Sequence, residues 1–216
     1  MKLQWHTCVS AVAGLLAGAL MVSAANAQGS AVIYKAELSP LNSKVTGSDA
    51  SGEATFTVSG DQLTIRISIK DVPPNMEHWQ HFHGFAKGDE QAQCPTVKND
   101  TNGDRIIDLI ETEPKAGTTM APFNADPAAF AIPKNTYPQS DINGSYTYEK
   151  TVSLKALQTA FEKQFPGQEL DLDRRVVFIH GVPSSTKLPP SVASLGDIPA
   201  QVTLPIACGE IRKSGN

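Results

Sequence analysis

Clustered positive charge and nucleotide-handling motifs are missing from this chain. Its 18 Lys and Arg residues are outnumbered by 22 Asp and Glu residues, and the basic residues form no stripe. Nucleic acid and anionic lipid surfaces both require clustered cations, so neither is an expected partner. There is no Gly-x-Ser-x-Gly motif and no phosphate loop, which leaves serine hydrolases and nucleotide-binding enzymes without support. Repeats and low-complexity runs are also absent.

Long hydrophobic runs are scarce as well, and the main one lies at the N-terminus. Residues 1–27 combine a positive start at Lys2, an apolar stretch from Val9 to Val22, and the small-x-small sequence Ala25-Asn26-Ala27. The stretch is short for a membrane span, and this order of features is typical of a secretory signal peptide. We therefore predict an exported protein, periplasmic or extracellular, with no membrane attachment after cleavage. The alternative is an uncleaved anchor.

Removal of the signal leaves residues 28–216, a length that suits a single domain with a sizeable core. Without Lys2, 17 basic residues remain against 22 acidic ones, a net charge of about −5. Cysteine is scarce too, since only Cys94 and Cys208 lie outside the signal. An even count in an oxidising compartment favours a disulfide between them. The alternative is two free or metal-bound thiols.

Alternating apolar and polar residues predict β-strands along much of the chain. The alternation is clearest over 52–58 and 63–69, which the turn Ser59-Gly60-Asp61 joins into a hairpin. Further strands are expected over 31–38, 78–83, 146–152, 176–180 and 199–211. Short strands at this spacing indicate an all-β fold, an antiparallel sandwich or barrel.

One short helix is expected among these strands. Ser153 is a suitable N-cap, an apolar face runs from Leu154 to Phe165, and Pro166-Gly167 ends the helix. We interpret that face as core packing rather than as a ligand site. Residues 99–145 show no strong strand pattern, and we expect them to form a long acidic and proline-rich insertion packed on the domain.

Histidine is rare and concentrated in two of the expected strands. Outside the signal, the chain has His78, His81 and His83 in one strand and His180 at the end of another. Because side chains alternate along a strand, His81 and His83 point the same way, whereas His78 faces with Phe82. Neutral imidazole suits copper and zinc, so we predict a metal site at His81, His83 and His180. We expect His78 to be a buried structural histidine bonded to backbone. The alternative is a solvated strand that happens to be rich in histidine.

An acidic segment of the insertion has the spacing of an EF-hand calcium loop. Counting from Asp100, oxygen-bearing side chains occupy positions 1, 3, 5, 9 and 12. Position 6, usually glycine, is Arg105, and Pro95 and Pro114 on either side are unlike paired EF-hand helices. The sequence predicts a lone calcium loop, and the alternative is a solvated acidic turn. The expected ligands are the side chains of Asp100, Asn102, Asp104, Asp108 and Glu111 and the carbonyl of Ile106.

Three motifs in order resemble the Cu,Zn superoxide dismutase family. They are His-x-x-His-x-His over 78–83 followed by Gly88-Asp89 and Cys94, then Val-Val-Phe-Ile-His-Gly over 176–181, then Ile-Ala-Cys-Gly-Glu-Ile over 206–211. The resemblance covers about 31–94 and 174–212. It implies a Greek-key β-sandwich or barrel, copper held by the three predicted ligands, and dismutation of superoxide to oxygen and hydrogen peroxide. The portion from residue 38 to 83 also resembles the CHRD domain, with its Ser-Gly-x-Ala-x-Phe strand and His-x-His-Gly.

The chain departs from the dismutase pattern at three places. No histidine lies between His83 and His180, so the bridging histidine and the other zinc histidines of the family are missing and zinc is not expected. The acidic loop 100–111 stands where zinc ligands would be expected. Pro205 occupies the position at which the family places an arginine to guide the anion.

These observations predict an exported copper-binding protein and leave its enzymatic status open. A small anion such as superoxide is the expected substrate if the protein is an enzyme. The alternative is a non-enzymatic CHRD-like module, either a copper carrier or a calcium-stabilised binding domain. The sequence predicts no oligomeric state.

Overall fold

The structure is a computed structural model that describes residues 30–88 and 90–215. The predicted signal over 1–27 lies outside the described residues, and so does Asp89 of the Gly-Asp motif. Within the described ranges, no helix has both the length and the apolar character needed to cross a membrane.

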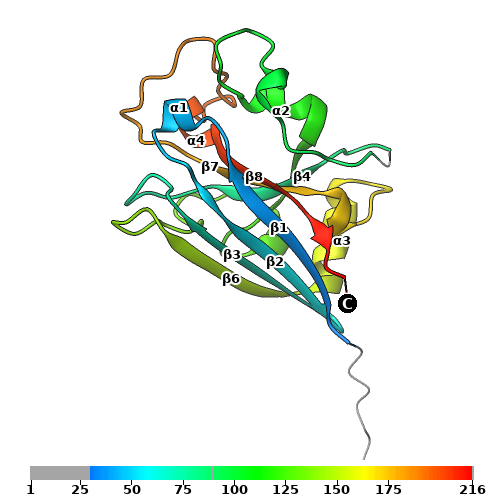
Figure 1. Cartoon of the computed structure of the whole chain (residues 1–216). Helices are drawn as coiled ribbons and strands as arrows, with labels where there is room; N and C mark the ends of the chain where they lie inside the picture. The colour runs from blue at the N-terminus through cyan, green and yellow to red at the C-terminus, as the bar shows by residue number, and fades with distance from the viewer. Residues whose placement is uncertain (1–29, 89, 216) are drawn as a thin grey trace, which may run out of the picture.

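The described chain is built around a single nine-stranded sheet that curls into a half-barrel (Figure 1). Its strands are β1 (Val32–Pro40), β2 (Ser51–Ser59), β3 (Gln62–Lys70), β4 (Gln80–Gly84), β5 (Thr118–Pro122), β6 (Tyr146–Ser153), β7 (Val176–His180), β8 (Pro205–Glu210) and β9 (Arg212–Lys213). They lie in the order β5-β4-β7-β8-β1-β2-β3-β6, with β9 paired to β1. All of these pairings are antiparallel, which confirms the all-β prediction.

Two crossings toward the β4 end of the sheet, and one return to β6 between them, determine which strands become neighbours. After β3 the chain crosses to β4 and β5 at one end of the sheet, and β6 then returns to pair with β3. The chain crosses a second time to β7, which pairs with β4, and β8 closes the gap between β7 and β1. Such crossings are the mark of a Greek key rather than of a meander. They place the histidine strand β4 beside β7, almost a hundred residues further along the chain.

The helices are short and lie outside the sheet. They are α1 (Ser43–Thr46), α2 (Leu109–Ala116), α3 (Leu154–Gln164) and α4 (Ala200–Thr203), with 3-10 turns η1 (Val97–Asn99), η2 (Pro127–Ala129) and η3 (Leu172–Arg174). In Figure 1, α1, α2 and α4 gather at the top of the view and α3 lies lower, at the right. The predicted helix is α3, since Ser153 accepts a hydrogen bond from the Ala156 N–H at 3.1 Å. Leu157 and Phe161 on its apolar face are fully buried.

Residues 99–145 depart most from the sequence-based expectation. This stretch shows no strong strand pattern and is predicted to be an insertion packed on the domain, yet it contains α2 and also β5, which joins the sheet beside β4. Pro114 lies inside α2, where proline usually ends a helix, and β5 has no alternating pattern. The prediction of one helix was therefore wrong. The strand expected over 199–211 also starts late, at Pro205, because α4 precedes it.

The sheet buries side chains on both of its faces around β7. Val177 and Ile179 belong to the large inner core together with Phe82 and Phe161. The alternate residues belong to a smaller outer core, which comprises Ala92, Ala116, Val176, Phe178 and Cys208. Because β7 is covered on both sides, its sequence is a continuous apolar run. The cover on the outer face comes from the segment 92–117, and this face carries the histidine site.

Candidate metal centre

The three predicted metal ligands come together on the outer face of the sheet. In the antiparallel register of β4 and β7, His81 lies opposite Phe178 and His83 lies opposite Val176, so His180 is the next position on the same face. Their ligand atoms all lie within 4.8 Å of one another. Across residues 30–88 and 90–215, this is the one group of three or more His, Cys, Asp or Glu side chains arranged to hold a metal ion.

Burial keeps the three imidazoles neutral. Their exposed fractions are 6% for His81, 7% for His83 and 6% for His180, and the His81 ring centroid lies 4.8 Å and 4.5 Å from those of the other two. Burial lowers the pKa of His83 to about 3 and that of His180 to about 4, and the proximity of His180 contributes to the first shift. The pKa of His81 is well below its usual value because of burial and of the two neighbouring histidines. Near neutral pH the site therefore presents neutral imidazoles, the form that binds metals.

Backbone carbonyls orient two of the three rings. His83 Nδ1 lies 3.1 Å from the Gly117 carbonyl oxygen, and His180 Nδ1 lies 2.7 Å from that of Thr203. A carbonyl only accepts, so Nδ1 carries the proton in each neutral ring and Nε2 presents the lone pair. His180 Nε2 is buried without a hydrogen-bond partner among the described residues. An unpaired buried acceptor is unfavourable, and a metal ion is a partner that would satisfy it.

Gly117 reaches His83 because it has no side chain. Its φ is +72°, and an added Cβ would lie 2.1 Å from the carbonyl oxygen of Gly84. Only glycine therefore lets the chain after α2 come this close to the end of β4. The sequence shows a glycine after Ala116, but no local signal connects it to a histidine more than thirty residues earlier.

Thr119 is a site residue that sequence reasoning missed. It lies opposite His83 in the register of β4 and β5. Its Oγ1 is 3.2 Å from Nε2 of His83 and 3.3 Å from Nε2 of His81. Since β5 has no strand pattern in the sequence, no signal could have placed this threonine beside β4.

His78 lies apart from the metal ligands and links two segments. It is fully buried, with Nδ1 3.0 Å from the His180 carbonyl oxygen and Nε2 2.8 Å from that of Pro73. Its ring stacks on Tyr146 with centroids 5.8 Å apart. Burial lowers its pKa, while the two carbonyls oppose that shift. These contacts fit the structural role that we expected for His78.

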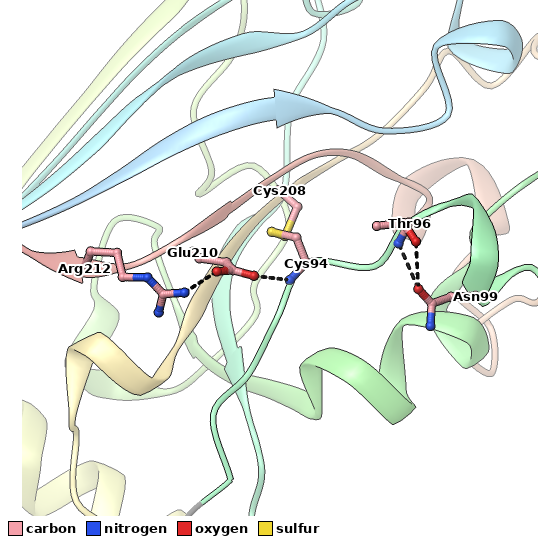
Figure 2. Close-up of a disulfide and its surroundings, with 6 residues drawn as sticks. All are labelled: Cys94, Thr96, Asn99, Cys208, Glu210 and Arg212. Atoms are coloured by element: carbon pink, nitrogen blue, oxygen red, sulfur yellow. Dashed lines mark hydrogen bonds and ion pairs between the residues drawn. A yellow bond between two sulfur atoms is a disulfide. The ribbon is translucent and has the colours of Figure 1, made fainter.

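The predicted disulfide between Cys94 and Cys208 is confirmed (Figure 2). The two Cα atoms are 5.8 Å apart although 114 residues separate them in sequence. Glu210 accepts a hydrogen bond from the Cys94 N–H at 3.2 Å and also pairs with Arg212. Cys208 lies opposite Phe178, whose ring centroid is 4.6 Å from that of His83. The disulfide therefore holds the outer cover against the sheet, one strand away from the histidine site.

The predicted calcium loop uses its side-chain oxygens for internal hydrogen bonds. Asp100 accepts from the N–H groups of Gly103 and Arg105 at 2.6 and 2.9 Å. Asn102 and Asp104 each accept from the backbone two residues further on, the second from Ile106. Arg105 has a φ of +68°, so position 6 adopts the left-handed conformation that usually requires glycine. Position 6 is thus compatible with an EF-hand loop. In the part of the chain that the structure describes, the carboxylates of Asp100, Asp104, Asp108 and Glu111 do not form a group arranged to hold a metal ion, and calcium stays a prediction.

The end of this loop anchors two other segments. Asp108 caps α2 by accepting from Ile110 and Glu111, and its second oxygen accepts from the Ala193 N–H at 2.8 Å. Glu111 accepts from both the N–H and the hydroxyl of Thr101 at 2.6 and 2.9 Å. The acidic loop is therefore joined to the proline-rich loop that follows His180.

A cavity of about 700 Å³ lies away from this centre. It is lined by segments 40–44 and 95–97 together with Asp100, Arg105 and Ile107. No histidine is among its described lining residues. The histidine site is therefore a buried cluster and not the floor of that cavity.

Comparisons with known proteins leave the site to be interpreted from its own residues. A scan against protein-family models and a search of curated proteins both found no match.

Proposed function

We propose that this chain is an exported copper-binding protein of the superoxide dismutase-like class, with His81, His83 and His180 as the ligands. The observation that carries the proposal is the convergence of three buried, neutral imidazoles with ligand atoms within 4.8 Å. An all-nitrogen donor set suits copper and zinc. The motif resemblance favours copper over zinc, because this chain matches the copper-ligand motifs of the family but lacks the family's zinc histidines.

The residues around the site support such a metal. The carbonyls of Gly117 and Thr203 orient the rings of His83 and His180 through hydrogen bonds to Nδ1. A metal-binding histidine usually donates its other ring N–H in this way. His180 Nε2 is buried and, within the described chain, unpaired. Bound copper would supply one-electron redox chemistry between Cu(II) and Cu(I), which dismutation of superoxide requires. The protein contributes the binding, the ring orientation and the exclusion of water.

We propose dismutation of superoxide as the reaction and expect it to be slower than in the fast enzymes of the family. Pro205 lies opposite His180 in the register of β7 and β8, so this position next to the ligand offers no cation to attract an anion. The chain also has no histidine to act as a bridging imidazole that delivers a proton.

Burial favours a second candidate, a non-enzymatic copper carrier or CHRD-like binding module. The ligands are only 6–7% exposed, so a substrate has little surface through which to reach them. A carrier needs tight binding, for which such burial is an advantage.

The decisive measurements are copper content and copper affinity of the exported protein. We expect one copper per chain, and His81→Ala should weaken binding by more than the roughly 10–100-fold that loss of a supporting residue causes. His78→Ala is the control, because it should lower stability but keep the copper stoichiometry. Failure of the wild-type protein to bind copper would refute the proposal. Dismutase activity of the copper-loaded protein, lost in His180→Ala, would select the enzyme, and full copper loading without activity would select the carrier.

A further inference from the structure

We propose that Thr119 is a fourth donor of the histidine site, an oxygen that makes the site prefer a divalent ion over Cu(I). This inference rests on the proposed function, in which the three histidines bind copper. It concerns a residue outside the motifs that suggested the metal.

The position of Thr119 comes from the strand register. Thr119 and His83 are opposite each other on β5 and β4, so their side chains share the outer face. Thr119 Oγ1 contacts the Nε2 atoms of both His83 and His81, at 3.2 and 3.3 Å. The side chain is partly buried, which limits the water that competes for these contacts.

The distances from Thr119 Oγ1 to the two Nε2 atoms match those expected between two donor atoms bound to the same ion. In a tetrahedral site with metal–nitrogen bonds of about 2.0–2.1 Å, neighbouring donor atoms are about 3.3 Å apart. The Nε2 of His83 has a free lone pair, because Nδ1 of that ring carries the proton and donates a hydrogen bond to the Gly117 carbonyl. One ion bound at this nitrogen would therefore have the Thr119 oxygen within its reach without a change of backbone.

The chemistry of the hydroxyl sets the direction of the effect. A neutral hydroxyl oxygen is a hard donor compared with imidazole, and hard donors favour divalent ions over the soft Cu(I). A site of three imidazoles and one hydroxyl therefore binds Cu(II) more tightly than three imidazoles alone, while Cu(I) gains little from the added oxygen. In the metal-free protein the same hydroxyl hydrogen-bonds to the two histidines.

Two substitutions at this position separate ligation from simple packing. Thr119→Val keeps the shape and removes the oxygen, whereas Thr119→Ser keeps the oxygen. Thr118→Val is the matched control, since Thr118 is the preceding residue of β5, is exposed, and points to the other face. The readouts are Cu(II) and Cu(I) affinities from competition with chelators, and the electron paramagnetic resonance spectrum of the Cu(II) form.

We expect Thr119→Val to weaken Cu(II) binding by about tenfold or more, because loss of a donor costs at least as much as loss of a residue that only supports a ligand. Cu(I) affinity should be nearly unchanged, and the Cu(II) spectrum should be altered. Thr119→Ser and Thr118→Val should match the wild type. If Thr119→Val does not fold, Thr119→Ala is measured in the same way. Wild-type-like or tighter Cu(II) binding without the hydroxyl, with an unchanged spectrum, would show that Thr119 only hydrogen-bonds to the free histidines. That result would leave copper binding intact, whereas a wild type without copper would end both proposals.

Discussion

Replacing Gly117 by alanine should damage the histidine site without touching a histidine. Gly117 has φ 72° and ψ −157°, a conformation that is essentially restricted to glycine. The new Cβ would lie 2.1 Å from the carbonyl oxygen and 2.4 Å from the carbonyl carbon of Gly84. Both are backbone atoms of β4, so no side chain can rotate to relieve the contact. Either β4 or the chain after α2 must move, and the Gly117 carbonyl then leaves His83.

The size of the effect follows from these contacts. Backbone strain at such a position costs about 1–3 kcal/mol. Loss of the hydrogen bond between His83 Nδ1 and the Gly117 carbonyl adds about 0.5–1.5 kcal/mol. We therefore expect the free energy of unfolding of metal-free Gly117→Ala to fall by about 1.5–4.5 kcal/mol. Loss of a partner that orients a ligand should also weaken copper binding by about 10–100-fold.

The assay is urea denaturation of the metal-free protein together with copper competition, and Gly167→Ala is the control. Gly167 has φ +81°, and within the described chain nothing lies within 4 Å of an added Cβ. This variant therefore carries backbone strain without a collision and should keep its copper affinity. Equal losses of stability in the two variants, with equal copper affinity, would refute the role assigned to Gly117.

Three further predictions concern the disulfide, pH and calcium. Replacing Cys94 and Cys208 by alanine should lower the free energy of unfolding by up to about 4–5 kcal/mol, because the bond closes a loop of 114 residues, and an unchanged urea midpoint would contradict this. The folded-state pKa values of about 3 for His83 and about 4 for His180 lie below the usual 6.5. Between each folded-state value and 6.5, the unfolded chain therefore binds more protons than the folded protein. The stability that the neutral histidines contribute to the metal-free protein should therefore be fully present above pH 6.5. Below that pH the free energy of unfolding should fall toward pH 4, by about 1.4 kcal/mol per pH unit for each histidine. Urea titrations at several pH values would measure this fall. Finally, millimolar calcium should raise the thermal midpoint of the wild type and leave Asp100→Ala unaffected, and an indifferent wild type would count against the loop.

Much of the fold could be predicted from local patterns. The alternation over 52–58 and 63–69 became β2 and β3, and Ser153 marked the start of α3. The strands around the histidines were found because an uninterrupted apolar run and a period-two pattern are both local properties of the chain. The disulfide was predictable for a different reason, since only two cysteines lie beyond the predicted signal.

The parts that could not be predicted depend on partners distant in sequence. α2 contains a proline in its interior. The helix is stabilised nevertheless, because Asp108 caps its N-terminus and Ala116 packs into the outer core. β5 is an edge strand without a pattern of its own, and it exists because β4 offers it hydrogen-bonding groups. A strand of this kind is specified by its neighbour and not by its own residues.

The sequence by itself determined which side chains can bind a metal. Four histidines in two expected strands, with His81 and His83 on one face, already selected the ligand set, because alternation along a strand follows from backbone geometry alone. Only the tertiary structure decided that His180 meets that pair, since the crossing that places β7 beside β4 involves residues far apart in the chain. The tertiary structure also decided which ring nitrogen of His83 and His180 has a free lone pair, and which hydroxyl oxygen lies beside His81 and His83. Those choices rest on contacts from Gly117, Thr203 and Thr119, whose hydrogen-bonding atoms become neighbours of the histidines only when the chain packs.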